Sequence, residues 1–226
     1  MHVGLGTGST AAWFVRLLAE RMKAEGLNLT CVATSSATVA LAEEVGVPLT
    51  EVEKAGAFDI TVDGADEFDA ALNLIKGGGA ALLQEKIVAA ASARLVILTD
   101  PSKRVECLGA FPLPVEIVRF GWPVTKRGVE AVLTDMDVDA RRVTLRMDGD
   151  APLVTDESHH ILDLHLERIG DAPALAKALN AVPGVVEHGL FINMADVVII
   201  GTEDGEAQVI RRVSLELAEE MRNQDA

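Results

Sequence analysis

The chain has 226 residues, of which 49% are hydrophobic, and its formal net charge is -15. This apolar content predicts a folded core rather than a disordered chain, and the length suits one large domain or two unequal ones. The acidic charge disfavours nucleic acid and anionic membranes as main partners, because both require a basic face. We therefore expect no nucleic-acid partner and no membrane partner.

The cysteine content and the hydropathy pattern predict where the protein works. Cys31 and Cys107 lie far apart in the chain, and we expect no secretory leader, reduced thiols and a cytoplasmic location. The longest apolar run, residues 87–98, is interrupted by Ser92 and Arg94. It is too short for a membrane span, which needs about 20 residues.

The first half of the chain alternates strand-like and helix-like segments. After an apolar stub at residues 1–5 and a glycine-rich loop, the pattern predicts a helix that ends at Gly26, with Trp13, Leu17, Leu18 and Met22 on its apolar stripe. Further strands are expected at 29–33, 58–62 and 95–98, and further helices at 38–45 and 80–93. Such alternation implies a parallel sheet covered by helices.

Each expected strand of this half is followed by a polar or glycine-rich loop. These loops are Gly4–Thr10, Thr34–Ser36, Asp63–Glu67 and Thr99–Lys103. In open α/β sheets, ligands bind outside the carboxyl ends of the strands. We therefore expect the four loops to meet in one crevice, which forms a single site.

The second half has a different order of elements. Strands are expected at 115–118, 143–147, 162–166 and 185–191, with helices at 123–133 and from Pro173 onward. This β-α-β-β-α-β order predicts a ferredoxin-like split βαβ sandwich. We predict a small α+β domain at 112–188 and a larger α/β domain at 1–111 and 189–226. A strand at 195–201 should return to the first sheet, and the tail after Gly205 should be helical or mixed.

The loop Gly4–Thr10, with the sequence GLGTGST, resembles a phosphate cradle. Its glycines let the backbone approach an anion, and the N–H groups at the start of the next helix can bind it. Ser9 stands where a dinucleotide fingerprint has its third glycine, and no Gly-Lys-Ser/Thr follows, so neither that fingerprint nor a P-loop is present. A plain turn with Ser9 or Thr10 as helix cap is an equally good interpretation.

Asp63 and Asp66 flank Gly64-Ala65, so a turn can place both carboxylates on one side. Crowding of like charges would raise one pKa toward the range useful for proton transfer. The alternative is an ordinary Asp-Gly turn in which Asp66 caps a helix. No histidine lies near these acids, which disfavours a metal site.

Glu85 lies in an expected helix with little polar face, so burial would raise its pKa toward that of a general base. An exposed glutamate beside Lys86 is the alternative. Lys76 precedes three glycines and could neutralise an oxyanion, and Lys103 could hold a phosphate or a hydroxyl.

Two further groups of residues are expected to be structural. His159 and His160 are adjacent and point to opposite faces of an extended segment, which favours a loop or strand entrance over a metal site. Trp13, Trp122 and the few phenylalanines are expected in the core or at a domain contact.

Together these motifs resemble ribose-5-phosphate isomerase of the A type. The resemblance runs in order from residue 3 to about 205, through GTGST at 6–10, VDGADE at 62–67, IKGGGAA at 75–81, EKI at 85–87, SK at 102–103, FPLPVE at 111–116 and PGVV at 183–186. It implies a Rossmann-like domain with a small α+β domain, catalysis without a cofactor or metal, and a homodimer or homotetramer. Family members usually carry a leading helix and most of the first strand before the glycine-rich loop, whereas this chain begins at Met1.

The resemblance also implies an activity and a site. The reaction interconverts D-ribose 5-phosphate and D-ribulose 5-phosphate through an enediolate, in the non-oxidative branch of the pentose phosphate pathway, with Glu85 as the base. Asp63, Asp66 and Lys76 would handle ring opening, proton transfer to the sugar oxygens and charge stabilisation. The sugar-phosphate site would be lined by Thr7, Gly8, Ser9, Thr10, Gly64, Ala65, Gly77, Gly78, Gly79 and Lys103.

Two other functions compete with the isomerase. One is a sugar-phosphate-sensing domain of a transcriptional regulator, which predicts loss of the base and an attached DNA-binding segment. The other is an acyl-CoA transferase-type enzyme, in which a glutamate attacks a thioester. Glu85 and Lys76 are present, and we find no basic helix-turn-helix pattern, so we favour the isomerase over the regulator.

Overall fold

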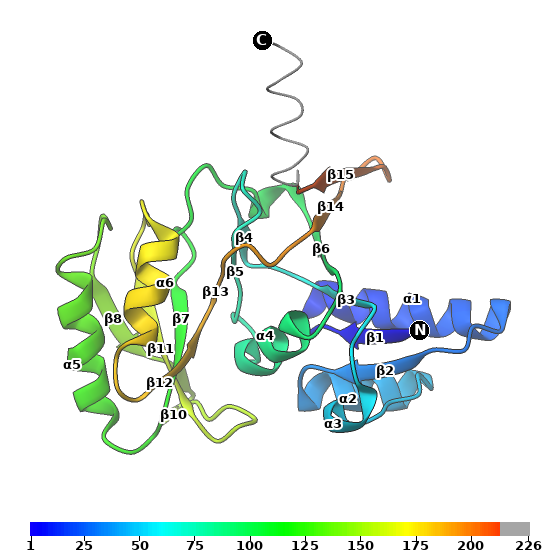
Figure 1. Cartoon of the computed structure of the whole chain (residues 1–226), viewed down its shortest axis with the longest axis horizontal. Helices are drawn as coiled ribbons and strands as arrows, with labels where there is room; N and C mark the ends of the chain where they lie inside the picture. The colour runs from blue at the N-terminus through cyan, green and yellow to red at the C-terminus, as the bar shows by residue number, and fades with distance from the viewer. Residues whose placement is uncertain (213–226) are drawn as a thin grey trace, which may run out of the picture.

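Two β-sheets, each with its own helices, organise the chain (Figure 1). This computed structural model describes residues 1–212. The larger sheet has the strand order β15-β14-β6-β3-β1-β2. Its strands are β1 (His2–Leu5), β2 (Thr30–Ala33), β3 (Ile60–Asp63), β6 (Leu95–Thr99), β14 (Val197–Gly201) and β15 (Ala207–Arg211). All neighbours pair in parallel except β15, which is antiparallel to β14.

The helices of this α/β unit follow its strands, as the alternation predicted. They are α1 (Ser9–Glu25), α2 (Ser36–Val45), α3 (Val52–Ala55), α4 (Leu82–Ala90) and the short 3-10 helix η1 (Pro101–Lys103). The chain passes from β1 to β2 on one side and then returns to place β3 on the other side of β1. Such a reversal leaves a crevice at the carboxyl ends of the two flanking strands, where α/β proteins bind ligands. The fold therefore predicts a ligand site at the loops after β1 and β3.

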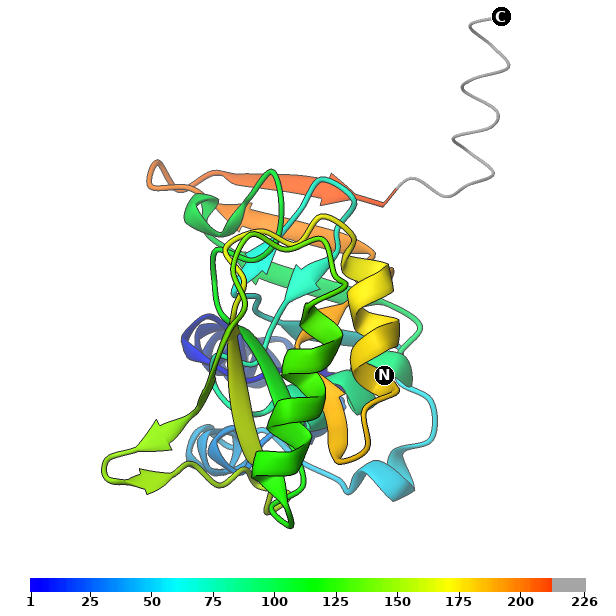
Figure 2. The same ribbon diagram turned by 90° about the vertical axis from the view of Figure 1, so that its left-hand side faces the viewer.

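The smaller sheet is antiparallel, with the strand order β12-β7-β11-β8. Its strands are β7 (Leu113–Ile117), β8 (Arg142–Leu145), β11 (His160–His165) and β12 (Val185–His188), and a hairpin of β9 (Met147–Asp148) and β10 (Ala151–Pro152) extends beyond it. The helices α5 (Trp122–Leu133) and α6 (Ala172–Asn180) lie next to each other along this sheet (Figure 2). The predicted start of α6 is confirmed, because the Asp171 carboxylate accepts a hydrogen bond from the N–H of Ala174 at 2.9 Å. This is the predicted split βαβ order with one added hairpin.

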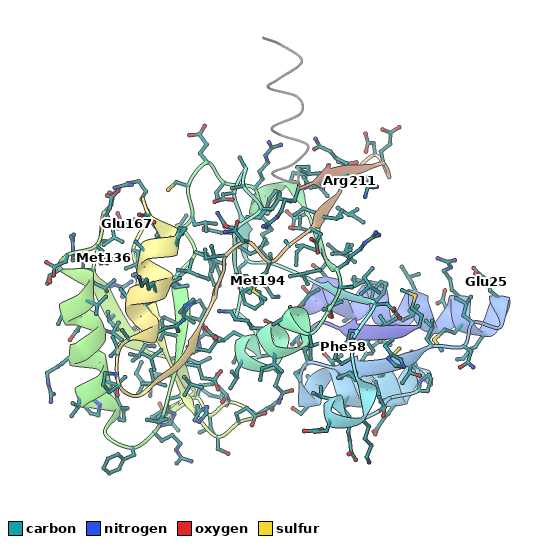
Figure 3. All side chains as sticks on the ribbon, viewed as in Figure 1. Glu25, Phe58, Met136, Glu167, Met194 and Arg211 are labelled. Atoms are coloured by element: carbon teal, nitrogen blue, oxygen red, sulfur yellow. The ribbon has the colours of Figure 1, made fainter. Side chains whose placement is uncertain are left out.

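A short three-stranded ribbon joins the two sheets. It consists of β4 (Glu67–Phe68), β5 (Leu74–Ile75) and β13 (Leu190–Phe191), in the order β13-β5-β4. The buried Glu67 carboxylate accepts hydrogen bonds from the N–H groups of Gly109 at 2.7 Å and Phe111. In Figure 3, Met194 lies between Met136, just after α5, and Glu25, at the tip of α1. In the chain, β13 of the ribbon lies between β12 of the smaller sheet and β14 of the larger one.

Several expected core residues lie elsewhere. Trp13 is 70% exposed and Leu17 is 55% exposed, because α1 packs on the sheet through the small buried residues Ala11, Val15 and Ala19. Phe120 is 93% exposed, so the prediction that the phenylalanines are buried is wrong there. Trp122 does pack against the core of the small sheet, as predicted.

The segment after Gly205, for which a helical or mixed structure is expected, begins with the strand β15. Residues 213–226, where the rest of this prediction falls, lie outside the described part. Within residues 1–212, no helix has both the length and the apolar character needed to cross a bilayer.

Candidate active site

A cavity of about 290 Å³ lies at the carboxyl ends of β1 and β3. The loops after β1, β3 and β5 form its wall, together with α4 and η1. The lining residues are Thr7, Gly8, Ser9, Thr10, Gly64, Ala65, Asp66, Lys76, Gly77, Gly78, Gly79, Glu85 and Lys103. The structure thus brings together every residue that the sequence proposed for the site except Asp63, which lies behind the wall. A cavity of this size suits a small metabolite.

The glycine-rich loop presents the start of α1 to this cavity. Gly8 is the N-cap residue with φ 105°, and no side chain among residues 1–212 caps the helix. Within this part of the chain the first N–H groups of α1 have no side-chain acceptor, and a helix start of this kind can bind an anion. The alternative in which Ser9 or Thr10 caps the helix is not what the structure shows.

The Thr34–Ser36 loop supports the glycine-rich loop from behind rather than lining the cavity. The hydroxyl of Thr7 lies 2.8 Å from both the Thr34 hydroxyl and the Ser35 hydroxyl. Ser36 in turn donates from its N–H and its hydroxyl to the two carboxylate oxygens of Asp156, both at 2.8 Å. Asp156 lies between β10 and β11, so the smaller unit reaches the loops of the larger one here.

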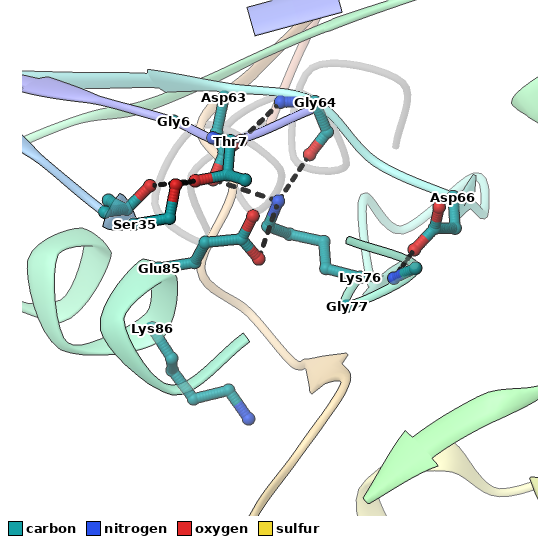
Figure 4. Close-up of polar contacts among 12 residues, drawn as sticks. Gly6, Thr7, Ser35, Asp63, Gly64, Asp66, Lys76, Gly77, Glu85 and Lys86 are labelled. Atoms are coloured by element: carbon teal, nitrogen blue, oxygen red, sulfur yellow. Dashed lines mark hydrogen bonds and ion pairs between the residues drawn. The ribbon is translucent and has the colours of Figure 1, made fainter. Parts of the chain in front are cut away.

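Lys76 is the centre of the polar contacts at the cavity (Figure 4). Its Nζ lies 2.9 Å from Oδ2 of Asp63 and 3.3 Å from Oε2 of Glu85, and it donates to the carbonyl oxygen of Gly64 at 2.7 Å. Only 3% of the side chain is exposed. Burial disfavours the charged form, but the Asp63 and Glu85 carboxylates outweigh this effect and raise the pKa of Lys76 above its ordinary value. Lys76 is therefore a fixed ammonium at the cavity wall.

Asp63 pairs with this ammonium and does not line the cavity. Its side chain is 1% exposed, and Oδ1 accepts hydrogen bonds from the N–H groups of Thr7 at 3.1 Å and Gly64 at 2.7 Å. Burial favours the neutral form, yet all of these partners are donors, and a protonated carboxyl would need an acceptor. Asp63 is therefore a carboxylate paired with Lys76.

Asp66 has different partners from Asp63. Its Oδ2 accepts a hydrogen bond from the N–H of Gly78 at 2.8 Å, and the residue lines the cavity. The two acids therefore do not form the pair that the turn suggested. Asp63 fixes Lys76, whereas Asp66 contacts the glycine loop.

Glu85 is buried in the first turn of α4, as the apolar helix predicted, with 4% of the residue exposed. Burial, together with the charge of Asp63, raises the pKa of Glu85 to about 8, against the lowering effect of Lys76. Among residues 1–212, Oε2 of Glu85 has no hydrogen-bond partner. The next residue, Lys86, points away from this group (Figure 4) and pairs with Glu187 at 2.8 Å. A carboxyl group that titrates near neutral pH beside a fixed ammonium can move protons next to a developing oxyanion.

The histidine pair contributes nothing to this cavity. His159 Nδ1 lies 3.0 Å from Oε1 of Glu116, and His160 Nδ1 lies 2.7 Å from the carbonyl oxygen of Leu153. Their different partners fit the predicted strand entrance, since His160 begins β11. In the described part of the chain, no group of three or more His, Cys, Asp or Glu side chains is arranged to hold a metal ion.

Sequence reasoning missed one residue next to the site. Arg146 follows β8 in the smaller unit and donates to the carbonyl oxygens of Gly77 at 2.8 Å and Gly78 at 3.1 Å. It belongs to no recognisable motif and lies far along the chain from those glycines, so the sequence carried no signal for this contact.

Comparisons with known proteins point to one family. A family model described as "Ribose 5-phosphate isomerase A (phosphoriboisomerase A)" matches residues 30–205. The chain is 58% identical over 209 residues to "Ribose-5-phosphate isomerase A" of Roseobacter denitrificans, covering 92% of this chain and 80% of that protein.

Solved structures give the same result. A ribose 5-phosphate isomerase from Plasmodium falciparum has a TM-score of 0.87 and 36% identity, covering 93% of this chain and 90% of that one. A D-ribose-5-phosphate isomerase in complex with phospho-erythronic acid has a TM-score of 0.87 and 37% identity, covering 94% and 91%.

Proposed function

This chain belongs to the ribose 5-phosphate isomerase A family, and from that premise we propose how its cavity carries out the reaction. The protein is an aldose–ketose isomerase that interconverts D-ribose 5-phosphate and D-ribulose 5-phosphate, a step of the pentose phosphate pathway. One observation carries the proposed mechanism. Glu85 is a buried carboxyl group with a pKa raised to about 8, placed on the cavity wall beside the ammonium of Lys76.

The phosphate end of the substrate is proposed to bind at Thr7–Thr10 and Lys103. The free N–H groups at the start of α1 and the positive end of its helix dipole favour a dianion there. Lys103, in η1, adds a positive charge on the same cavity. The protein has a net charge of -15, so this local arrangement supplies the positive potential for an anionic substrate that the protein as a whole lacks.

Glu85 is proposed to move the proton between the two carbons that change oxidation state. As a carboxylate it removes the proton from C2 of the open-chain aldose, and the electrons of that C–H bond form the C1–C2 double bond of the enediolate. The π electrons of the C1 carbonyl move to O1, and a proton passes from O2 to O1. The protonated Glu85 then delivers its proton to C1 while the C2=O double bond forms, which gives the ketose. Lys76 would stabilise the negative oxygen of the enediolate, because its ammonium lies 3.3 Å from Glu85.

The two aspartates are proposed to have separate roles. Asp63 keeps Lys76 charged and in place through the contact at 2.9 Å. Asp66 lines the cavity and keeps one oxygen outside its hydrogen bond to Gly78, so it is the acid placed to exchange protons with the sugar oxygens during ring opening. This division is supported by burial, because Asp63 is 1% exposed and does not line the cavity.

Replacement of the base tests the mechanism. We expect Glu85→Gln to lower kcat by about 10²–10⁴-fold, the usual contribution of a positioned base, and to leave KM within about threefold because the phosphate contacts are intact. The matched control is Glu20→Gln, an exposed glutamate on α1, which should leave both constants unchanged. In D₂O the wild type should exchange solvent deuterium into the substrate, whereas Glu85→Gln should not. Unchanged turnover in Glu85→Gln would remove Glu85 from the role of base.

The sensing-domain alternative is not supported. The curated relative and the solved structures named above are isomerases, and Glu85 and Lys76 lie together on the cavity. The resemblance further predicts turnover without a cofactor or metal, which an assay in the presence of EDTA can test.

The wider organisation is proposed on the same basis. We propose a small domain at residues 112–188 within a larger domain of residues 1–111 and 189–226, which the separate membership of the two sheets supports. We also propose a homodimer or homotetramer in the cytoplasm, as the family resemblance implies. Light scattering on the purified protein distinguishes the two assemblies.

A further inference from the structure

Arg146 connects the smaller unit to the glycine loop of the cavity. Its Nη1 donates to the carbonyl oxygens of Gly77 at 2.8 Å and Gly78 at 3.1 Å. Its Nε and Nη2 donate to the two carboxylate oxygens of Asp163 on β11, with the Nε contact at 2.9 Å. The side chain is 14% exposed. The planar guanidinium is therefore fixed on one side by a carboxylate and on the other by the loop.

These contacts set the direction of two successive peptide groups. In a planar trans peptide, the C=O and the following N–H point in opposite directions. The carbonyl of Gly77 faces Arg146, and the N–H of Gly78 accordingly points the other way and donates to Asp66 at 2.8 Å. The carbonyl of Gly78 also faces Arg146, so the N–H of Gly79 points away from Arg146. Gly79 itself lines the cavity.

Arg146 adds to one backbone hydrogen bond of this loop, from the N–H of Ala80 to the carbonyl oxygen of Gly77 at 3.0 Å. Glycine tolerates many backbone conformations, so a free Gly-Gly-Gly segment can flip its peptide groups at little cost. Hydrogen bonds from a charged donor to a carbonyl are stronger than those between neutral groups, so they favour one orientation. Arg146 supplies two such bonds, and Asp163 limits the freedom of the guanidinium itself.

We propose that Arg146 is a positioning residue of the isomerase, through which the smaller unit orients the N–H of Gly79 toward the reacting sugar oxygens and that of Gly78 toward Asp66. Arg146 does not line the cavity and acts through the peptide groups that it holds. The inference rests on the proposed function, because it requires an oxyanion to form at this wall. It predicts a loss in kcat rather than in phosphate binding, since Thr7–Thr10 and Lys103 are untouched.

The test compares Arg146→Ala with Arg168→Ala. Arg168 lies in the same unit and pairs with Asp137 and Asp139, but it does not line the cavity. We expect Arg146→Ala to lower kcat at least tenfold with KM within threefold, and Arg168→Ala to leave both unchanged. Millimolar guanidinium, well below denaturing concentrations, should restore part of the kcat of Arg146→Ala and leave that of Arg168→Ala unaffected. A purely structural loss would not respond to added guanidinium.

The result can overturn the proposal in two ways. A kcat for Arg146→Ala within twofold of the wild type, or a loss that equals the unfolded fraction and is not restored by guanidinium, rules out the positioning role. If Arg146→Ala does not fold, Arg146→Lys tests the proposal instead. Lysine keeps the positive charge but lacks the planar guanidinium that donates to both the carboxylate and the loop. Arg146→Lys should retain less than a third of the wild-type kcat, and wild-type kcat there would contradict the proposal. An inactive wild-type protein in the same assay would instead refute the isomerase function itself.

Discussion

The Nζ of Lys76 lies 3.3 Å from Oε2 of Glu85, and that oxygen accepts no hydrogen bond from any residue between 1 and 212. The ammonium is oriented instead by Asp63 and by the carbonyl oxygen of Gly64. Lys76 therefore lies closer to Asp63 than to Glu85, at 2.9 Å against 3.3 Å. Burial and the negative charge of Asp63 outweigh the lowering effect of Lys76, so the pKa of Glu85 rises to about 8 despite the nearby ammonium.

The first prediction concerns the pH dependence of the wild-type enzyme. Because only the carboxylate form of Glu85 can accept a proton, kcat/KM should rise with pH and level off above about 8. Steady-state rates between pH 5.5 and 9.5 measure this curve. The substrate phosphate has its second pKa at about 6, so its titration does not affect the profile between pH 7.5 and 9.5. A flat profile from pH 7 to 9 would contradict the assignment.

The second prediction concerns stability. Glu85 keeps its proton up to a pH of about 8 in the folded state, whereas the ordinary value is 4.5. Between these values the folded chain binds one proton more than the unfolded chain, so the contribution of Glu85 to stability is largest below pH 4.5 and is lost as pH rises. The slope is at most about 1.4 kcal/mol per pH unit.

Glu85→Gln removes this titration. Relative to the wild type, its free energy of unfolding should therefore increase steadily from pH 5 to pH 8.5, so that the inactive variant is the more stable protein at high pH. Urea unfolding at pH 5, 7 and 8.5 measures the difference. A constant difference across the three pH values would show that Glu85 titrates normally.

The third prediction concerns the buried ion pairs of Lys76. Lys76→Met leaves Asp63 and Glu85 buried without their counter-charge, which should destabilise the protein by about 3–5 kcal/mol and abolish turnover. The double variant Asp63→Asn/Lys76→Met should recover part of the stability but none of the activity. Lys54→Met is the control, because its exposed pair with Glu51 should contribute less than about 1 kcal/mol. Equal effects of the two lysine substitutions on unfolding would contradict the burial argument.

The fourth prediction separates two glycines of the site. A Cβ at Gly6 would lie 2.1 Å from Oδ1 and 2.6 Å from the Cα of Asp63, so the backbone of β3 would have to move. Gly6→Ala should cost about 1–3 kcal/mol or more. A Cβ at Gly79 would meet its nearest neighbour, Cγ2 of Thr7, at 3.7 Å, an ordinary contact. Gly79→Ala should therefore leave the free energy of unfolding within about 0.5 kcal/mol, and thermal unfolding of both variants provides the comparison.

The fifth prediction concerns the phosphate end. Lys103→Met should raise KM with little change in kcat, because the phosphate charge is the same in the ground state and in the transition state. Competitive inhibition by inorganic phosphate should weaken by a similar factor. Lys54→Met again serves as the control, since this exposed lysine lies outside the cavity. A fall in kcat at unchanged KM would place Lys103 at the reacting carbons instead.

Much of the cavity could be predicted from sequence because its residues lie in loops whose place the strand order determines. Thr7, Gly64 and Lys103 each follow a strand of one parallel sheet, so their loops must meet at one edge. The apolar surroundings of Glu85 in α4 likewise predicted its burial, because the helix offers almost no polar face. Local pattern and topology were sufficient in these cases.

The remaining features depend on contacts that a linear pattern does not contain. Asp63 and Asp66 look equivalent in sequence, and only the approach of Lys76 distinguishes them. Trp13 looks like a core residue, but the face of α1 that meets the sheet is set by the small residues that permit close packing. Arg146 reaches Gly77 from a different sheet, and no spacing rule relates the two.

The two hydrogen bonds between Asp156 and Ser36 join segments that lie 120 residues apart. The smaller sheet is therefore not structurally independent, because its loop carries the acid that accepts hydrogen bonds from Ser36, the first residue of α2. A chimera that exchanges this unit for one from a distant relative would separate Asp156 from its serine and Arg146 from its glycines at once. Recombination between relatives should succeed only where these long-range pairs are inherited together.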